Sequence, residues 1–282
     1  MKKIHIIGLG LLGGSFALAL KKKLPNLHFT GYDLSAENLK DALALGIIDE
    51  VAQEPAADTD VVILATPADT LKELLLKTLD QVGPETLIMD FGSTKAALCE
   101  AVAEHPKRTQ FLAGHPIAGT EYSGPKAAQE DLLDKKVFII CEMEKTDLNL
   151  KAYAYDLLEA LNMKLRFMDP EEHDLHLAFV SHLSHITSFM LGKTVLDKME
   201  DEKNIFDMAG SGFASTVRLA KSSPAMWAPI IGENKKNILE AMSLYIANLS
   251  RFRDKIIADD HAGVFQEMEK VNKIKDVLDM GK

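Results

Sequence analysis

The chain has 282 residues, of which 47% are hydrophobic, enough for one large globular domain or two ordinary ones. Its 32 basic and 42 acidic residues give a net charge of −10, so we expect no nucleic acid and no anionic membrane surface as a partner. An anionic ligand would need a local basic pocket. The two cysteines, Cys99 and Cys141, lack CxxC spacing and are too few for a disulfide framework, which favours a cytoplasmic location.

The first 23 residues imitate a secretory signal, because basic residues flank an apolar stretch. Four glycines within residues 8–14 would weaken a signal helix, and the lysines at 21–23 are a poor start for a mature chain. We therefore interpret this segment as part of the folded protein. No other stretch is long enough to span a bilayer.

Strands and helices are predicted to alternate along the first 169 residues. Apolar runs predict strands at residues 3–10, 29–33, 61–67, 86–93, 110–115, 135–142 and 163–169. Helical patterns between them predict helices at residues 11–23, 35–46, 71–83, 94–105 and 148–162. The alternation indicates an α/β domain of the Rossmann type, with a doubly wound parallel sheet covered by helices on both faces.

The pattern changes after Asp169 and Pro170. Long stretches with helical periodicity follow, such as residues 176–196 and 233–257, and we find no convincing strand among them. We therefore predict a nucleotide-binding domain at residues 1–169 and an all-helical substrate and dimerisation domain at residues 170–282. The apolar helices are too numerous for a small isolated bundle, so we expect a homodimer formed through this domain.

A glycine-rich turn, GLGLLG, stands between the first predicted strand and helix. In that context Gly8 allows a tight turn, Gly10 lets a pyrophosphate approach the backbone, and Gly13 lets the helix pack closely on the strand. The predicted cofactor contacts in this turn are Gly8, Gly10, Leu11, Leu12 and Gly13. The alternative is a glycine-rich turn that binds no ligand.

Asp33 follows Gly13 by twenty residues, at the end of the second predicted strand. There its carboxylate can accept hydrogen bonds from an adenosine ribose and repel a 2′-phosphate, which favours NAD over NADP. Thr66 and Pro67 end a later strand on the same carboxyl edge of the sheet. We expect both to contact the cofactor as well.

His115 lies in the segment FLAGHPIAGTE, where Gly114, Pro116 and Gly119 prevent a helix from starting at once. It is therefore predicted to end a buried strand at the carboxyl edge of the sheet, where ligands of open α/β sheets bind. Ser93 ends another strand on that edge, and its hydroxyl could fix the tautomer of a neighbouring imidazole. The alternatives are a histidine satisfied by local hydrogen bonds and a serine that caps a helix.

Four histidines, His173, His176, His182 and His185, follow in HDLHLAFVSHLSH. At about 100° per residue, the pair 173/176 and the pair 182/185 fall on different faces of one helix, so we expect no metal site. Ser181 and His185 share a face and could line a polar pocket.

Arg218 is the only arginine between Arg166 and Arg251. Gly210 and Gly212 before it, and Ser223 and Pro224 after it, indicate a short helix held between loops. The default for an arginine is a surface charge, but inside a cleft its planar guanidinium would bind a carboxylate.

With these segments in order, the sequence resembles the prephenate/arogenate dehydrogenase family over nearly its full length. The resemblance rests on Asp33 and on the segments GLGLLGGS, ATP, DFGSTK, GHPIAGTE, SHLSH and STVRLAKSSPAMW. It implies NAD-dependent oxidative decarboxylation of prephenate to 4-hydroxyphenylpyruvate in tyrosine biosynthesis, by a homodimer built through the helical domain. Some members of this family carry a C-terminal regulatory ACT domain or a fused chorismate mutase, and we expect this chain to have room for neither.

The resemblance also implies roles for individual residues. His115 would hydrogen-bond the ring hydroxyl of the substrate, with Ser93 as its partner, and Arg218 would bind a carboxylate of the dianion. Further substrate contacts would come from Thr120, Glu121, Ser181, His185 and Trp227.

Three other functions remain open at this point. Arogenate carries an amine where prephenate has a keto group, and a protonated His185 would favour prephenate. A β-hydroxyacid dehydrogenase would need a catalytic lysine in the stretch SHLSHITSFMLGK. A non-catalytic NAD-binding sensor would not need Ser93, His115 and Arg218 together.

Overall fold

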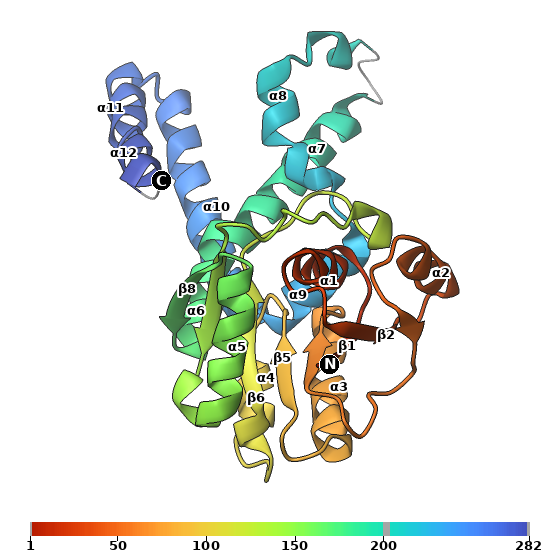
Figure 1. The fold of residues 1–282 in the computed structure, drawn as a ribbon. Helices are drawn as coiled ribbons and strands as arrows, with labels where there is room; N and C mark the ends of the chain where they lie inside the picture. The colour runs from red at the N-terminus through yellow and green to blue at the C-terminus, as the bar shows by residue number, and fades with distance from the viewer. Residues whose placement is uncertain (1, 200–203, 281–282) are drawn as a thin grey trace. The chain divides into compact units, whose positions relative to one another are not determined.

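Figure 1 shows the computed structural model, which describes residues 2–199 and 204–280. The chain forms two compact units, residues 1–235 and residues 236–282. The first unit contains the whole sheet and the helices up to residue 233. The predicted change from alternating strands and helices to helices alone falls between β8 and α6, whereas the predicted domains 1–169 and 170–282 stay a prediction.

One eight-stranded sheet, ordered β3-β2-β1-β4-β5-β6-β7-β8, forms the centre of the first unit. Its strands are β1 (Lys3–Ile7), β2 (His28–Tyr32), β3 (Glu50–Val51), β4 (Val61–Leu64), β5 (Leu87–Asp90), β6 (Phe111–Pro116), β7 (Val137–Cys141) and β8 (Lys164–Met168). All seven predicted strands are present, and only the two-residue edge strand β3 was not predicted. The order reverses beside β1, so a crevice forms at the carboxyl ends of β1 and β4.

The prediction of a parallel sheet is wrong for one pair of neighbours. Strand β7 runs antiparallel to β6, with His115 opposite Ile139, while every other neighbouring pair is parallel. The connection between β6 and β7 carries one 3₁₀ turn, Pro125–Ala127, and no α-helix. A parallel return needs a crossover connection, usually a helix, so this segment brings the chain back in the opposite direction.

Helices cover both faces of the sheet, as Figure 1 shows. They are α1 (Leu11–Lys23), α2 (Ala36–Ala44), α3 (Ala68–Gln81), α4 (Ala96–Ala101) and α5 (Leu148–Ala160). Side chains alternate along β4, so that Val61 and Ile63 join one apolar cluster with α1 and α5, while Val62 and Leu64 join another with α3 and α4. The strands are buried on both faces, as a doubly wound sheet requires.

Local signals at α2 work as the sequence predicts. The Ser35 hydroxyl caps the helix by accepting a hydrogen bond from the Asn38 N–H, with 3.2 Å between the atoms. Gly46 follows the helix with φ +69°, a conformation that glycine adopts without strain. The helix therefore begins and ends where its capping residues place it.

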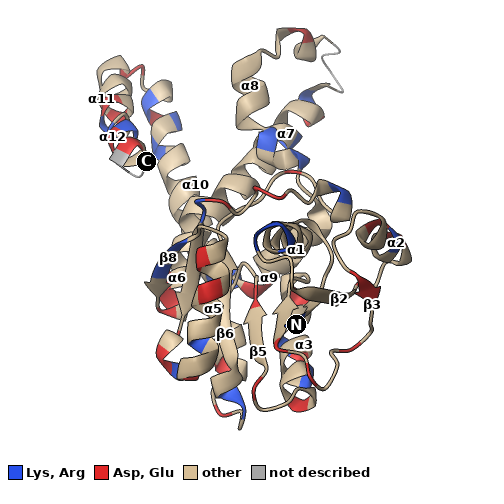
Figure 2. Cartoon of the chain, in the orientation of Figure 1, with Lys and Arg blue, Asp and Glu red and all other residues tan. Residues whose placement is uncertain are grey.

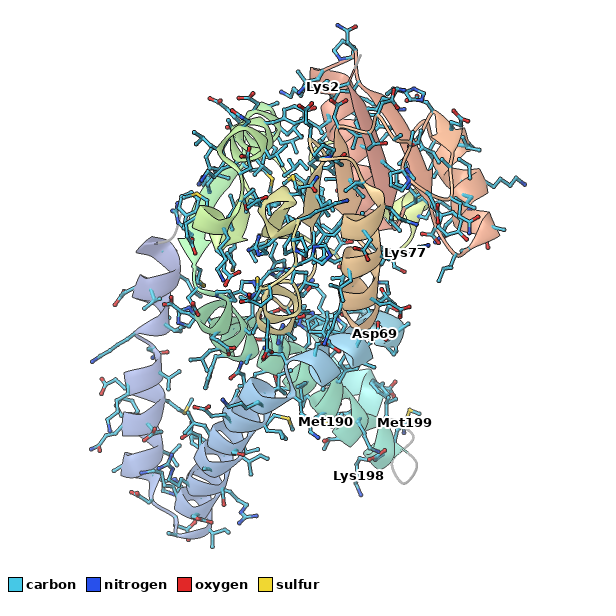
Figure 3. The ribbon with its side chains drawn as sticks, turned by 90° about the horizontal axis from the view of Figure 1, so that it is seen from below. Lys2, Asp69, Lys77, Met190, Lys198 and Met199 are labelled. Carbon is cyan, nitrogen blue, oxygen red and sulfur yellow. The ribbon has the colours of Figure 1, made fainter. Side chains whose placement is uncertain are left out.

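Helices follow β8 within the first unit. They are α6 (Pro170–Leu177), a π-helical turn (Ala178–His182), α7 (Leu183–Met199), α8 (Ser211–Thr216) and α9 (Pro224–Glu233). Figure 2 shows that α8 carries no charged residue, so Arg218, in the 3₁₀ turn Arg218–Lys221, is the first charge after it. Figure 3 shows α9 beside the end of α3 that carries Asp69. The helical segment thereby reaches the carboxyl edge of the sheet.

The second unit, residues 236–282, takes in α10 (Lys235–Ile257) from its second residue and contains α11 (His261–Val271) and α12 (Ile274–Met280). Many of its large apolar side chains are exposed, including Ile246, Leu249 and Phe265. Among the residues that the structure describes, no helix is long and apolar enough to cross a membrane.

Candidate active site

The glycine-rich turn after β1 has the geometry of a nucleotide-binding turn. Gly8 has φ +97°, and a Cβ at Gly8 would lie 2.4 Å from the Ala65 carbonyl oxygen. A Cβ at Gly13 would lie 2.2 Å from the Gly8 carbonyl oxygen, so a larger residue would push α1 off the strand. A Cβ at Gly10 would meet nothing within 4 Å, which leaves open space above the turn. This space fits the predicted approach of a pyrophosphate to the backbone.

The N-terminus of α1 points its backbone donors at that space. The helix begins at Leu11 and Leu12, and no side chain caps it. The first N–H groups of a helix have no partner within the helix and carry a partial positive charge. A phosphate group bound here would therefore be stabilised without a basic side chain.

Asp33 is held in place just after β2. Its Oδ2 accepts a hydrogen bond from the Leu9 N–H at 3.0 Å, and its Oδ1 accepts from the Ser35 N–H at 2.9 Å and from Asn38 Nδ2 at 3.0 Å. These three donors fix the carboxylate directly beside the glycine-rich turn. Its charge lies where an adenosine ribose would be recognised, so the residues present fit NAD.

A cavity of about 540 Å³ opens beside this turn. It is lined by Gly10, Glu37, Asn38, Asp41, Pro67, Ser123, Gly124, Pro125, Lys126, Ser223, Ala225 and Met226. Pro67 lines this cavity and is the N-cap residue of α3. The neighbouring Thr66 hydroxyl accepts a hydrogen bond from the Thr70 hydroxyl at 2.9 Å. The structure thus brings Gly10 and Pro67 to one cavity.

His115 lies near the end of β6 and is 7% exposed. The strand extends one residue beyond it, to Pro116. The preceding Gly114 donates its N–H to Asp90 Oδ1 at 3.0 Å, and a Cβ there would lie 2.5 Å from the Phe138 ring. Only glycine fits this contact, which fixes the backbone that carries the imidazole.

A fully buried ion pair lies next to this strand end. The Lys95 ammonium donates to Asp90 Oδ2, which also accepts the Gly92 N–H at 3.0 Å. Asp90 thus ties the end of β5 to β6 and to the start of α4. Removing either charged partner would leave a buried charge uncompensated, which is strongly destabilising.

The structure connects His115 to His173, a residue of α6. Nδ1 of His115 lies 2.9 Å from Nε2 of His173, and Nδ1 of His173 lies 2.7 Å from Oδ1 of Asp174. Asp174 also accepts the Lys95 N–H at 2.7 Å and the Ala96 N–H at 2.9 Å. A carboxylate from α6 therefore caps α4, and a chain of contacts runs from it to His115.

Burial lowers the pKa of His115 well below its usual range, and electrostatic interactions with His173, Lys95 and His182 lower it further. Burial also lowers the pKa of His173, opposed by the hydrogen bond to Asp174, and lowers that of His182 to about 4. All three imidazoles are therefore neutral at neutral pH. A neutral His115 has one ring nitrogen that can accept a proton.

Other predicted neighbours of His115 are placed differently. Among the described residues, the only hydrogen-bond contact of the His115 ring is with His173, and the ring makes none with the Ser93 hydroxyl. Ser93 is half-buried and does not cap α4, since Lys95 is the N-cap residue. The Thr120 hydroxyl accepts the Tyr122 N–H at 3.2 Å within its own loop. The proposed contacts of Ser93 and Thr120 with substrate stay predictions.

The predicted grouping of the four histidines is wrong. His173 and His182 are both buried, and the charge of His173 contributes to lowering the pKa of His182, whereas His176 is half exposed. The π-helical turn Ala178–His182 widens one turn of the helix, so the regular 100° step does not hold across it. Among the residues that are described, no group of three or more His, Cys, Asp or Glu could hold a metal ion.

Arg218 and Glu121 meet, although 97 residues separate them. Arg218 Nη1 lies 3.6 Å from Glu121 Oε2, and the arginine side chain is 55% exposed. The positive charge of Arg218 also contributes to lowering the pKa of His185. Arg218 thus belongs to a cluster of predicted site residues rather than to an isolated surface position.

His185 stacks on Trp227, with ring centroids 3.6 Å apart. Its Nδ1 lies 3.0 Å from the backbone oxygen of Ser181, so these two residues are brought together through the backbone of one helical turn. Trp227 also meets His182 edge to face, with centroids 5.9 Å apart. Among the residues that the structure describes, none is a hydrogen-bond partner of its buried indole Nε1.

Burial, together with Arg218, lowers the pKa of His185. Its imidazole is therefore mainly neutral at neutral pH. The structure does not support the argument that a protonated His185 favours prephenate at that pH. The lysine in the stretch SHLSHITSFMLGK, which a β-hydroxyacid dehydrogenase would need, is Lys193. Lys193 Nζ binds both carboxylate oxygens of Asp197, at 2.9 and 2.7 Å, with 63% of its side chain exposed.

Sequence reasoning missed the connection between Asp174, His182 and α9. Asn234 donates from Nδ2 to the Asp174 carbonyl at 2.6 Å and lies 3.2 Å from Nδ1 of His182. It also missed Lys95 and Asp90 as buried partners. The sequence does show Asp174 next to His173 in HDLH, and Asp90 and Lys95 in DFGSTK. Which of these residues contact each other depends on the fold.

Known proteins match both halves of the chain. A sequence profile described as "Prephenate dehydrogenase, nucleotide-binding domain" matches residues 16–167, and one described as "Prephenate dehydrogenase, dimerization domain" matches residues 169–270. The prephenate dehydrogenase of Bacillus subtilis strain 168 is 34% identical over 98% of this chain and 76% of its own length.

Solved structures match as well. The prephenate dehydrogenase of Aquifex aeolicus, in complex with hydroxyphenyl propionate and NAD⁺, is 32% identical with a TM-score of 0.88, covering 98% of both chains. Synechocystis arogenate dehydrogenase is 25% identical with a TM-score of 0.78, covering 98% of this chain and 99% of its own. With two family profiles spanning most of its length and a relative above 30% identity, the chain belongs to the prephenate dehydrogenase family of NAD-dependent oxidoreductases.

Proposed function

We propose that this protein catalyses the NAD-dependent oxidative decarboxylation of prephenate to 4-hydroxyphenylpyruvate, a step of tyrosine biosynthesis. The observation that carries the proposal is the placement of His115, a neutral and nearly buried imidazole near the end of β6, on the same carboxyl edge of the sheet as the crevice. The named relatives add support, since one is a prephenate dehydrogenase of 34% identity and another was solved with NAD⁺.

The cofactor would be held by the glycine-rich turn, with Leu11 and Leu12 at the start of α1 and with Asp33 at the ribose. Thr66 and Pro67 would contact it from the end of β4. When bound, NAD accepts the hydride that leaves the ring carbon bearing the hydroxyl. The protein's own residues then have to orient the substrate and manage one proton.

His115 would take that proton. As the hydride leaves, positive charge develops at the carbon that carries the hydroxyl, and an imidazole that accepts the hydroxyl proton relieves it. A positioned general base contributes about 10²–10⁴-fold in rate. Loss of carbon dioxide from the opposite ring carbon makes the ring aromatic, and the proton returns to the product oxygen, so none is consumed overall.

Arg218 would bind a carboxylate of the dianionic substrate, which an acidic protein otherwise repels. Glu121 pairs with Arg218, so a substrate carboxylate would compete with Glu121 for the guanidinium. Ser93, Thr120, Ser181, His185 and Trp227 are proposed as further contacts on the substrate.

The test is to compare the turnover of prephenate and arogenate side by side, with NADH formation followed by the absorbance of the reduced nicotinamide. The proposal predicts faster turnover of prephenate. Preference for arogenate would assign the chain to the arogenate branch of the family. No NADH with either substrate, with NAD still bound, would favour a non-catalytic sensor.

We also propose a homodimer that forms through the helical region and works in the cytoplasm. The matched dimerization-domain profile covers residues 169–270, and large apolar side chains are exposed there. Met190 and Met199 on α7, labelled in Figure 3, are 51% and 38% exposed. Exposed apolar surface of this kind is typical of a protein interface. Cys99 and Cys141 are both free and buried, in keeping with a reducing compartment.

A further inference from the structure

The contact between His115 and His173 determines more than the orientation of a ring. A neutral imidazole carries one proton, and the nitrogen that lacks it is the only one that can accept another. A general base at the substrate must therefore hold its proton on the far nitrogen. The partners of His115 Nδ1 decide whether it does.

Asp174 sets the direction of the hydrogen bonds in this chain of contacts. Its carboxylate accepts two backbone N–H groups, from Lys95 at 2.7 Å and from Ala96 at 2.9 Å, so its oxygens act as acceptors. Nδ1 of His173, at 2.7 Å from Oδ1, must then be the donor to it. The reverse arrangement would point two lone pairs at each other in a buried site.

The positions of the remaining protons follow, because each neutral imidazole ring carries one N–H proton. With its proton on Nδ1, His173 presents a lone pair at Nε2, which accepts a hydrogen bond from His115 Nδ1 at 2.9 Å. His115 is then left with a lone pair at Nε2. Among the described residues, that nitrogen has no hydrogen bond, so it stays available to a substrate.

We propose that His173, backed by Asp174, is a positioning residue that fixes His115 in the Nδ1–H tautomer and so makes its Nε2 the base for the reaction. This inference rests on the proposed function for its role in catalysis. When the substrate O–H bond breaks, its proton binds His115 Nε2 and its electron pair stays on oxygen. The Nδ1–H bond to His173 then strengthens, because the donor ring is charged.

The titratable and charged groups around the pair come from several elements. Lys95 precedes α4, Asp90 ends β5, and His182 lies in the π-helical turn, while Asp174 is next to His173. Asp174 is the carboxylate in hydrogen-bond contact with the His173 ring, and Asp90 is neutralised by Lys95. Positive charge that develops on His115 is therefore compensated through His173.

The direct test reads the tautomer by NMR of ¹⁵N-labelled histidine side chains in the full-length protein without substrate. The His115 signals are assigned by their loss in His115→Asn. We expect a protonated Nδ1 and an unprotonated Nε2 in the wild type. In His173→Leu, which removes the acceptor, the two forms should mix. In His173→Gln, whose amide oxygen can replace the acceptor, the wild-type tautomer should return.

A wild-type His115 protonated at Nε2 would overturn the proposal, even if His173→Leu failed to fold. An unchanged tautomer in a folded His173→Leu variant would overturn it too. The matched control is His176→Gln, three residues along α6, whose half-exposed ring lies outside the chain of contacts. It should leave the His115 signals unchanged.

Kinetics separate positioning from a merely structural role. His173→Leu should lower kcat for prephenate about 10- to 150-fold, the effect of losing one charge-assisted hydrogen bond, with little change in the KM for NAD. Combined with His115→Asn, it should cost nothing further, because the base that it positions is already gone. An equal loss in both backgrounds would mean structural damage and contradict the proposal.

The two levels of inference fail in different ways. A wild-type protein that does not oxidise prephenate would refute the proposed function, and the tautomer measurement would still decide the placement of the proton. A wild-type enzyme with full turnover and the opposite tautomer would leave the function standing and refute the role of His173.

Discussion

Arg218 and Glu121 form an ion pair between a 3₁₀ turn of the helical segment and the loop after β6, with Nη1 and Oε2 3.6 Å apart. The pair brings a cation from one part of the first unit to the loop that follows the proposed base. The arginine is more than half exposed, so a dissolved carboxylate can reach it.

Replacing Arg218 should weaken substrate binding. Loss of a charge-assisted hydrogen bond costs about 1.5–3 kcal/mol, so Arg218→Ala should raise the KM for prephenate about 10- to 150-fold. The KM for NAD should change little, as should both constants in the control Arg253→Ala, an exposed arginine of α10. An unchanged KM for prephenate in Arg218→Ala would return this residue to the role of a surface charge.

Asp33 should set the choice of cofactor. Its fixed carboxylate would repel the 2′-phosphate of NADP, so the wild type should strongly prefer NAD. In Asp33→Ser the ratio of kcat/KM for NADP to that for NAD should rise by about tenfold or more, equivalent to about 1.4 kcal/mol. Asp58→Asn, at an exposed carboxylate paired with Lys3, is the control. Equal efficiency of the wild type with both cofactors would refute the assignment.

The protein should lose stability as the pH falls below about 6.5. Burial lowers the pKa of His5, a fully buried residue of β1, from 6.5 to about 4. The unfolded chain therefore takes up a proton below pH 6.5 that the folded protein binds only near pH 4. His5 alone should lower the free energy of unfolding by about 2 kcal/mol between pH 7 and pH 5.

Urea unfolding at the two pH values measures this loss. In His5→Asn the difference between pH 7 and pH 5 should shrink by about 2 kcal/mol, whatever the variant's stability at pH 7. His261→Asn, at an exposed histidine, is the matched control. The same difference in His5→Asn as in the wild type would show that His5 does not titrate as its burial implies.

The proposed dimer should depend on exposed apolar residues of the helical region. Ile246 on α10 is 59% exposed, and Ile246→Glu would place a charge in the interface. Light scattering after gel filtration should give a dimer for the wild type and a larger monomer fraction for this variant. Asn248→Glu, two residues along the same helix, should stay dimeric. A monomeric wild type would refute the dimer.

The nucleotide-binding half could be predicted well because its signals are local. Gly8 turns the chain with φ +97°, Gly13 packs against the Gly8 carbonyl, and Ser35 caps the N–H of Asn38, so each has the local role that its pattern indicates. Strand alternation needs only neighbouring residues too. The antiparallel turn of β7 was not predictable in this way, since strand direction depends on what the long segment between β6 and β7 does in space.

The proposed substrate site shows where local reasoning ends. His115 could be singled out from its glycine-flanked strand end, but its partner is 58 residues away and lies on another element. The π-helical turn shifts the helical phase, so that His173 and His182 are both buried, contrary to a regular period. Contacts that depend on such a shift, or on burial, appear only once the chain is folded.

The central claim, that His115 is the base for oxidation of prephenate, is tested most directly by the pH dependence of kcat/KM for prephenate, which reports the free enzyme, in the wild type and in His115→Asn. Because the pKa of His115 lies well below its usual range, the wild type should stay active below pH 6.5 and lose activity only as the pH falls through that lowered value. His115→Asn should lower kcat about 10²–10⁴-fold, bind prephenate and NAD nearly as before, and lose this acid limb. Near-normal turnover with the same acid limb would contradict the claim and direct the search for the base to His185.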